Sequence, residues 1–476
     1  MSNASHQGRA AAVTGHADHP PSARGALASL ALAMLLPSLA TSIANAGLPT
    51  LAHAFDASFP QVQWIVLAYL LAITTLIVSV GRLGDLVGRR ALLLVGIAVF
   101  TLASVACGVA PALWLLIAAR AAQGLGAAIM LALTMAFVAD TVPAARTGRA
   151  MGMLGTMSAV GTALGPSLGG VLISGLGWRA IFLVNVPLGV VTFALARRHL
   201  PADHRRAPDR PGFDLAGTLV LALTLAAYAL AVTIGRGHFG AINGALLLAA
   251  LGGVGLFLRV EAGAASPLIQ LARLRDRALR ASLTMTALVS TVMMATLVVG
   301  PFYLARGLGL DPARVGLALS IGPLITALTG VPAGRLVDRH GAAHVTRVGL
   351  GTMAAGAVLL TVLPAALGLA GYLAPIVVTT VGYALFQTAN NTAVMAGLRP
   401  DQRGVVSGLV NLARNLGLVT GASVMGAVFI LASGTSDLIA APSDDLAIGM
   451  RVTFAVAALL IGGALIIAGP ARPTRR

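Results

Sequence analysis

The chain consists of long apolar stretches separated by short polar segments. Each stretch is close to the roughly 20 residues that a helix needs to cross the hydrocarbon core of a bilayer, and none shows the alternation of a membrane barrel strand. Because backbone groups in lipid must be satisfied internally, we expect every stretch to be a helix. The pattern predicts fourteen spans, at residues 27–50, 62–80, 91–110, 113–138, 150–174, 179–196, 214–235, 241–259, 281–304, 315–333, 345–366, 371–397, 405–432 and 448–469.

The polar segments differ in charge, and this difference predicts an orientation. Every second connection is rich in arginine, as are both termini, whereas the connections between them carry few charges. Basic connections stay in the cytoplasm, so both termini are predicted to be cytoplasmic, in a multi-pass protein of the cell (inner) membrane. An error of one span would destroy this agreement, which supports an even number of spans.

Composition narrows the class of protein further. The chain is 57% hydrophobic and 10% charged, with a mean hydropathy of +0.90, whereas soluble proteins carry about 25% charged residues. The net charge of +17 comes from arginines dispersed among the connections, so the lipid bilayer, and not nucleic acid, is the expected partner. No metalloprotease, nucleophile-elbow or Walker motif occurs, and Cys107 is the only cysteine. We therefore expect no catalytic residue, cofactor or metal, and ATP-driven transport is not favoured.

The N-terminus contains a segment, Ala44-Asn45-Ala46, that resembles a signal-peptide cleavage site. The apolar run that begins at Ala26 is longer than the apolar core of a signal peptide, and its polar lead of about 25 residues is long. Cleavage would also leave an odd number of spans. We interpret this segment as a retained first span.

A motif occurs twice and predicts duplicated halves. The pattern G-R-L-x-D-x-x-G begins at Gly81, after the second span, and again at Gly334, after the tenth. If spans seven and eight are an insertion, the tenth span is the second helix of a second six-helix half, and such duplication places a central site at the bilayer midplane. The predicted units are a cytoplasmic tail at 1–25, an N-terminal half at 26–198, a linker with two extra spans at 199–280, a C-terminal half at 281–470 and a tail at 471–476.

The repeated motif is predicted to be a cytoplasmic loop that helps to select between two states. Asp85 is placed to pair with a neighbouring arginine or to lie at a helix N-terminus, where an anion is favoured. A charge cluster that forms when the halves close on that side would stabilise one state. The alternative is that Arg89 and Arg90 only fix the topology. The motif residues are Gly81, Arg82, Gly84, Asp85, Gly88, Arg89 and Arg90, with Asp338 in the second copy.

Two arginines are predicted inside spans. Arg120 lies about 10 Å deep in the fourth span, given a rise of 1.5 Å per residue, with Gln123 one turn away and Gly124 next to it. A charge at that depth costs several kcal/mol and indicates a functional role. Arg414 in the thirteenth span is similar but lies nearer the cytoplasmic end. For both, the alternative is a side chain that reaches the interface.

Small and polar residues mark two further features. In the fifth span, Gly161, Gly165 and Gly169 form a flat face for close helix packing, with Pro166 and Gly170 beside them; the alternative is ordinary packing. Intramembrane polar residues are candidates for a substrate cavity, and the alternative for each is an interhelical hydrogen bond worth less than about 1 kcal/mol. These candidates are Asn45, Tyr69, Gln387, Asn390, Asn391 and Arg414, among which Gln387 and Asn391 share a helix face.

Taken together, the Gly81–Arg90, Arg120-x-x-Gln123-Gly124 and Gly161–Gly170 motifs resemble those of the major facilitator superfamily, specifically the fourteen-span drug:H⁺ antiporters. The resemblance implies an MFS-type bundle in which the fourth-span arginine takes part in proton coupling. It also implies that the fifth-span motif belongs to an antiporter, and therefore to export. Trp64 and Tyr69 match the family as well.

The first span departs from the family pattern. The family usually has an aspartate ahead of T-x-x-N-x-A-L-P, whereas here Ala40 stands in the acid's place. None of the 15 acidic residues falls near the centre of a predicted span. The carboxylate that usually carries the proton is therefore missing.

The predicted function is secondary active transport, namely proton-driven multidrug or small-molecule efflux by alternating access. Its partners are a small-molecule substrate and the proton; periplasmic or outer-membrane efflux partners are left unspecified. The scarcity of buried acids makes a neutral or anionic substrate a competitor to a cationic one. One alternative is an uptake symporter or facilitator for a neutral or anionic metabolite. A membrane enzyme or receptor would need a catalytic set or a soluble sensing domain, and neither is visible.

Overall fold

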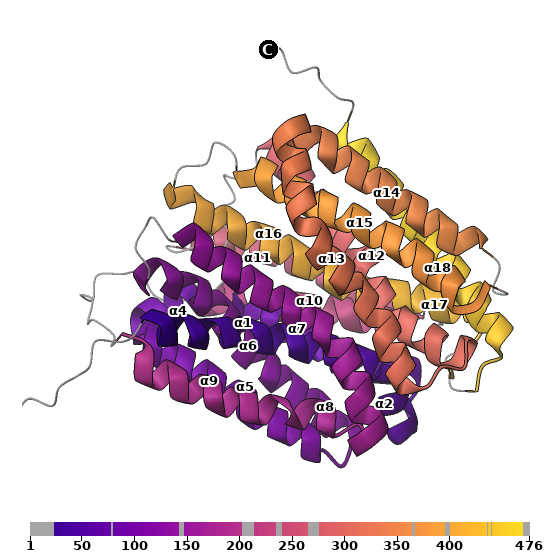
Figure 1. The fold of residues 1–476 in the computed structure, drawn as a ribbon, viewed down its shortest axis with the longest axis horizontal. Coiled ribbons are helices and arrows are strands. Elements are labelled where there is room, and N and C mark those ends of the chain that lie inside the picture. The colour runs from indigo at the N-terminus through magenta and orange to yellow at the C-terminus, as the bar shows by residue number, and fades with distance from the viewer. Residues whose placement is uncertain are drawn as a thin grey trace, which may run out of the picture.

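A computed structural model describes residues 23–77, 80–141, 147–201, 214–234, 240–264, 276–363, 367–395, 400–435, 437–438 and 440–469. Every regular element in these ranges is a helix (Figure 1), as the apolar pattern predicted. The helices are α1 (Ala23–Ala46), α2 (Leu48–Ala54), α3 (Phe59–Ile77), α4 (Val80–Val87), α5 (Arg89–Val109), α6 (Leu113–Thr141), α7 (Thr147–Leu176), α8 (Ala180–Leu183), α9 (Asn185–His199), α10 (Leu215–Thr233), α11 (Ala241–Gly263), α12 (Arg277–Phe302), the π-helical turn η3 (Tyr303–Gly307), α13 (Pro312–His340), α14 (Ala342–Val362), α15 (Gly368–Met395), α16 (Pro400–Thr420), the π-helical turn η5 (Gly421–Met425), α17 (Gly426–Ser433) and α18 (Ser443–Ala468).

The number of apolar helices agrees closely with the fourteen predicted spans. Within the described residues, thirteen helices are long and apolar enough to cross a membrane, and Leu215–Ala231 in α10 is a shorter apolar helix. Several spans are built from consecutive helices, so that α16, η5 and α17 together form the predicted thirteenth span. The chain is thus a multi-pass membrane protein.

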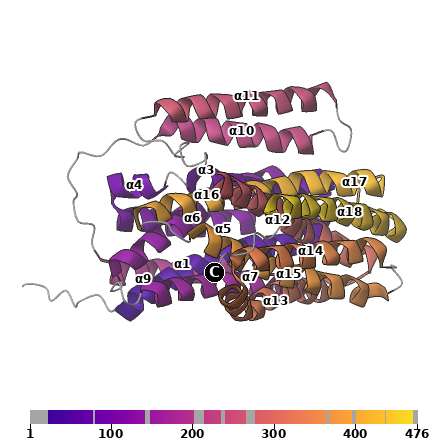
Figure 2. The ribbon, with the colours of Figure 1, turned by 90° about the horizontal axis from the view of Figure 1, so that it is seen from above.

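The helices pack as two groups with a separate pair at the side. In the N-terminal half, which we define as α1–α9, α1 packs along α7 and α3 packs on α6. In the C-terminal half, α12–α18, α14 packs on α15 and α12 on α16. The inserted pair, α10 and α11, lies along one side of the bundle, where α10 contacts α3 (Figure 2).

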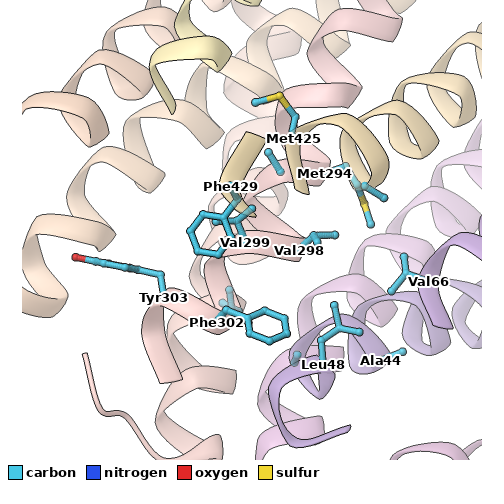
Figure 3. Packing of buried hydrophobic residues seen from close by; sticks show 14 of the residues in the cluster. Ala44, Leu48, Val66, Met294, Val298, Val299, Phe302, Tyr303, Met425 and Phe429 are labelled. Atoms are coloured by element: carbon cyan, nitrogen blue, oxygen red, sulfur yellow. The ribbon is translucent and has the colours of Figure 1, made fainter. Parts of the chain in front are cut away.

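The largest cluster of buried apolar residues joins the two halves at one end of the bundle. At the end formed by α2 and the start of α3, here called the closed end, one cluster contains residues of both halves. Figure 3 shows Leu48, on α2, near Phe302 of α12, and Val66 of α3 across from Met294. At the other end, where the described chain begins and ends, separate clusters lie within the N-terminal and the C-terminal half. The halves are therefore closed together at one end of the bundle.

Both copies of the repeated motif are helical, so the predicted loop was wrong. Residues 81–87 belong to α4, and the second copy forms the last turns of α13. Each copy ends at a glycine with positive φ, which is +102° at Gly88 and +79° at Gly341. A side chain is strained in this backbone region, and each glycine begins the next helix. Each copy of the motif is helical up to its last glycine, and the chain turns into the next helix at that glycine.

Candidate functional site

The side chain of Arg120 is completely buried between three helices of the N-terminal half. Its Nε donates to the carbonyl of Ile65 on α3 at 3.0 Å, and its Nη1 lies 3.4 Å from the carbonyl of Ala40 on α1. Its Cζ is 4.0 Å from the centre of the Tyr69 ring. The guanidinium therefore does not reach the interface, and backbone carbonyls and an aromatic face surround it instead.

Gln123 extends this arrangement to a fourth helix. Its Oε1 accepts from Nη1 of Arg120, and its Nε2 donates to Oγ of Ser104 on α5 at 2.7 Å. Gly124 keeps the helices close, because a Cβ there would lie 2.5 Å from the carbonyl of Tyr69. The structure thus brings together Arg120, Gln123, Gly124 and Tyr69, four of the residues selected from the sequence.

The buried charge of Arg120 has no carboxylate among its hydrogen-bond partners in the described structure. The groups that contact it are two carbonyls, one amide oxygen and one ring, and its Nη2 has no hydrogen-bond partner there. An uncompensated buried charge is costly. Ala40, which stands where the family resemblance led us to expect an acid, supplies no carboxylate to this site.

A second group of candidates lines a small pocket in the C-terminal half. Gln387, Asn390 and Asn391 project from α15 and meet Arg414 of α16. Tyr383 and Phe386 supply its aromatic wall, and Thr286 and Ser290 of α12 complete its polar side. Arg414 and Asn391 are exposed. This small pocket combines an aromatic surface, amides and one cation.

Asn390 differs from the other residues of the pocket because both its amide oxygen and its amide nitrogen are bonded to α12. It is 3% exposed, accepts from Ser282 Oγ at 2.7 Å and donates to Thr286 Oγ1 at 2.9 Å. Its role is therefore to join α15 to α12. Gln387, Asn391 and Asn411 are the other amides that line the pocket.

The pocket does not include the two candidates from the N-terminal half. Tyr69 is completely buried and donates to the carbonyl of Pro37 at 2.9 Å. Asn45 is 1% exposed, and neither of its amide atoms has a hydrogen-bond partner in the described structure. The candidates thus divide between a buried N-terminal network and an open C-terminal pocket.

The glycine stripe of α7, Gly161, Gly165 and Gly169, packs against α1. A Cβ at Gly161 would lie 2.6 Å from the carbonyl of Leu35, and one at Gly169 would lie 2.8 Å from the side chain of Ile43, both on α1. Gly165 similarly faces Ser42 of α1.

Pro166 and Gly170 face the other half of the molecule. A Cβ at Gly170 would collide with the carbonyl of Pro312 on α13, and one at Gly316 would collide with the carbonyl of Pro166. Ser167 N donates to Ser320 Oγ at 3.0 Å across the same boundary. Backbone contact between α7 and α13 therefore closes this side of the bundle.

The charged residues of the repeated motif are only partly described. The backbone of Arg82 and Asp85 is described but their side chains are not, so the proposed charge cluster stays a prediction. Arg90 donates to the carbonyl of Arg197 at the end of α9, and Asp338 is exposed. Within the described residues, no group of three or more His, Cys, Asp or Glu side chains is arranged to hold a metal ion.

Sequence reasoning missed Gln63. This residue lies in the closed end, is 2% exposed, and donates from its amide to the carbonyl of Ala422 in η5, which belongs to the other half. Phe59, one turn earlier, packs edge-on against Phe302 with 4.8 Å between ring centroids. A polar residue inside a predicted span was the available signal, because such a residue needs a partner.

Two helical halves joined at one end, a buried arginine network and a polar pocket define a multi-pass membrane transporter. The sequence matches the family model of the Major Facilitator Superfamily over residues 30–422, and the chain belongs to this superfamily.

Its relatives include transporters with different names. The chain is 32% identical to the "Uncharacterized transporter YebQ" of Escherichia coli over 85% of its own length and 89% of that protein. It is 30% identical to the "Multidrug resistance protein Stp" of Mycobacterium tuberculosis, covering 84% of this chain and 75% of the relative. It is also 29% identical to the "Riboflavin transporter RibZ" of Clostridioides difficile, covering 84% and 87%.

The fold is similar to that of solved transporters. A bacterial homologue of the human lysosomal transporter Spinster, in an inward-facing and occupied conformation, aligns with a TM-score of 0.69 and 15% sequence identity. The alignment covers 93% of this chain and 95% of the other.

Proposed function

We propose that the protein exports small lipophilic compounds from the cytoplasm by proton-coupled alternating access. Its place is the cell (inner) membrane, with both termini in the cytoplasm, and no catalytic step is involved. The observation that carries the proposal is the contact of Pro166 and Gly170 with α13, because it makes the glycine motif of α7 part of a seal between the halves. The arginine-rich connections assign the closed end to the periplasm.

This orientation makes the described state one that can load an exporter. The closed end is shut by the joint apolar cluster, whereas the clusters toward the other end lie within single halves. The pocket around Gln387 and Arg414 belongs to the half that separates there. A compound that arrives from the cytoplasm or the inner leaflet would reach this pocket first.

The charges of the pocket favour neutral or anionic compounds over cations. Arg414 is the only charged residue that lines the described pocket, and Arg120 is a second cation, buried and without an acid among its hydrogen-bond partners in the described structure. A cationic substrate would find no carboxylate at either place. Relatives are named for multidrug resistance and for riboflavin transport, and we propose an uncharged or anionic aromatic compound as the substrate class.

The direct test is dye efflux in a host that lacks its major pumps. We expect cells that express the protein to expel a neutral or anionic dye, and an uncoupler that removes the proton gradient to stop this efflux. The empty vector and the Arg120→Ala variant, matched for expression, are the controls. Efflux that persists with the uncoupler would remove the antiport proposal, and dye accumulation would show an uptake protein instead.

Orientation needs a separate measurement. Reporter fusions at position 205, in an arginine-rich connection, should show a cytoplasmic location. A periplasmic location would reverse the assignment of the closed end.

A further inference from the structure

The inserted helix α10 is bonded to both halves of the molecule. It lies beside the bundle (Figure 2) and contacts both α3 and η5. The Trp64 ring nitrogen on α3 donates to Thr233 Oγ1 at 3.2 Å, and the Tyr228 hydroxyl donates to Thr420 Oγ1 at the end of α16, also at 3.2 Å. Apolar residues continue this contact, since Leu221 and Leu225 of α10 share a buried cluster with α16.

Both threonine hydroxyls act as acceptors in these bonds, because each donates its own proton elsewhere. The hydroxyl of Thr233 donates its own proton to the Ala229 carbonyl at 2.8 Å, and that of Thr420 donates to the Leu416 carbonyl at 2.8 Å. Each oxygen therefore offers a lone pair to its neighbour, while the indole N–H of Trp64 can only donate. In these two bonds α3 therefore donates to α10, and α10 donates to α16.

A direct bond between the halves lies next to them. Gln63, which precedes Trp64, donates to the carbonyl of Ala422, two residues after Thr420. We call the three bonds Gln63–Ala422, Trp64–Thr233 and Tyr228–Thr420 the gate ring. It runs from α3 to η5, through the adjoining end of α16 to α10, and back to α3.

The local backbone is shaped for this close approach. Residues Gly421–Met425 form a π-helical turn, a feature that often occurs at functional positions because it disturbs the regular bonding of the helix. A Cβ at Gly426 would collide with the amide of Gln63 and lie 3.0 Å from the ring of Phe59. At Gly421, a Cβ would collide with the Thr291 carbonyl.

We propose that α10 is a third component of the closed-end gate and that Trp64 and Tyr228 are its positioning residues. The gate ring holds α3 against η5 through a helix that belongs to neither half. When the halves separate at the closed end, the Gln63–Ala422 bond and at least one bond of α10 must break. The inserted pair therefore helps to set the balance between the two states. This inference rests on the alternating access of the proposed function, but not on its direction, its substrate or the proton.

The test measures the conformational balance itself. In a Cys107→Ser background, spin labels on cysteines at Ala54 of α2 and Leu431 of α17, both exposed in the closed end, report the distance between the halves in lipid nanodiscs. We expect a short and a long distance population in the parent. Tyr228→Phe removes only a hydroxyl and should raise the long-to-short ratio about fivefold, as expected for the loss of one neutral hydrogen bond. Trp64→Phe should act in the same direction.

Thr352→Val is the matched control, because its hydroxyl donates only to Val348 of its own helix at 2.9 Å. It should leave the ratio unchanged. An unchanged ratio in both Tyr228→Phe and Trp64→Phe would overturn the role of α10 and leave alternating access intact. A single distance population in the parent, with and without the exported dye, would instead overturn the proposed rocking of the halves and this inference with it.

Discussion

The guanidinium of Arg120 lies over the ring of Tyr69, with 4.0 Å between Cζ and the ring centroid, and both side chains are completely excluded from solvent. Tyr69 in turn donates to the carbonyl of Pro37. The ring thus holds the arginine of α6 against α3 and connects it to α1. A rearrangement of any of these three helices would change the surroundings of the charge.

The planar set of N–H donors in the guanidinium of Arg120 should be as important for transport as its charge. Its Nε and Nη1 reach the carbonyls of Ile65 and Ala40, and a lysine offers one compact ammonium in place of this planar donor set. We expect Arg120→Lys and Arg120→Ala both to reduce transport at least about tenfold, since each loses more than one hydrogen bond to a charged donor. Dye efflux in vesicles, normalised to the protein in the membrane, measures this. Full activity of Arg120→Lys would show that charge alone suffices.

An acid at position 40 should change the coupling of transport. The Ala40 carbonyl is within 3.4 Å of Nη1, and Nη2 has no partner in the described structure, so Ala40→Asp would place a carboxylate close to an incompletely bonded guanidinium. We expect efflux of a cationic dye to appear or rise and to become steeper with external acidity. Ala40→Asn, which adds bulk and polarity without charge, is the control. Equal behaviour of the two variants would contradict the prediction.

Contact between α7 and α13 should be intolerant of added volume. A side chain at Gly316 would collide with the carbonyl of Pro166. We therefore expect Gly316→Ala to prevent closure and to abolish efflux, while the protein still reaches the membrane. Gly155→Ala on α7 is the matched change, because nothing lies within 4 Å of its added Cβ. Comparable loss in both variants would show a general sensitivity of these helices.

The positive φ of Gly341 predicts that alanine substitutions at Gly341 and at Gly351, at the start and in the middle of α14, differ in their effect on stability. Gly341 begins α14 at φ +79° and ψ +149°, a conformation that costs other residues about 1–3 kcal/mol. Gly351, in the middle of α14, has open space around it, and alanine there should be neutral or stabilising because it favours the helix. Thermal unfolding in detergent should show a lower midpoint for Gly341→Ala than for Gly351→Ala. The reverse order would be inconsistent with the turn.

Much of this protein could be predicted from local properties of the sequence. The length and polarity of each apolar run identified the spans, because lipid leaves a run of about 20 apolar residues no other regular structure than a helix. The charge at Arg120 and the spacing of Gly161, Gly165 and Gly169 were equally visible, since both are unusual inside a span. The small side chains predicted a face for close helix packing, and the structure shows that α1 is the helix that packs against it.

Tertiary structure decided which helices meet. Nearly uniform apolar helices give little indication of which face contacts a neighbour, so the sequence could not show that Gln63 bonds to η5 or that α10 joins both halves. It could not separate Asn390, whose amide links two helices, from Gln387, which lines the pocket. These distinctions depend on residues far apart in the chain, and only their arrangement in space determines what each polar group bonds.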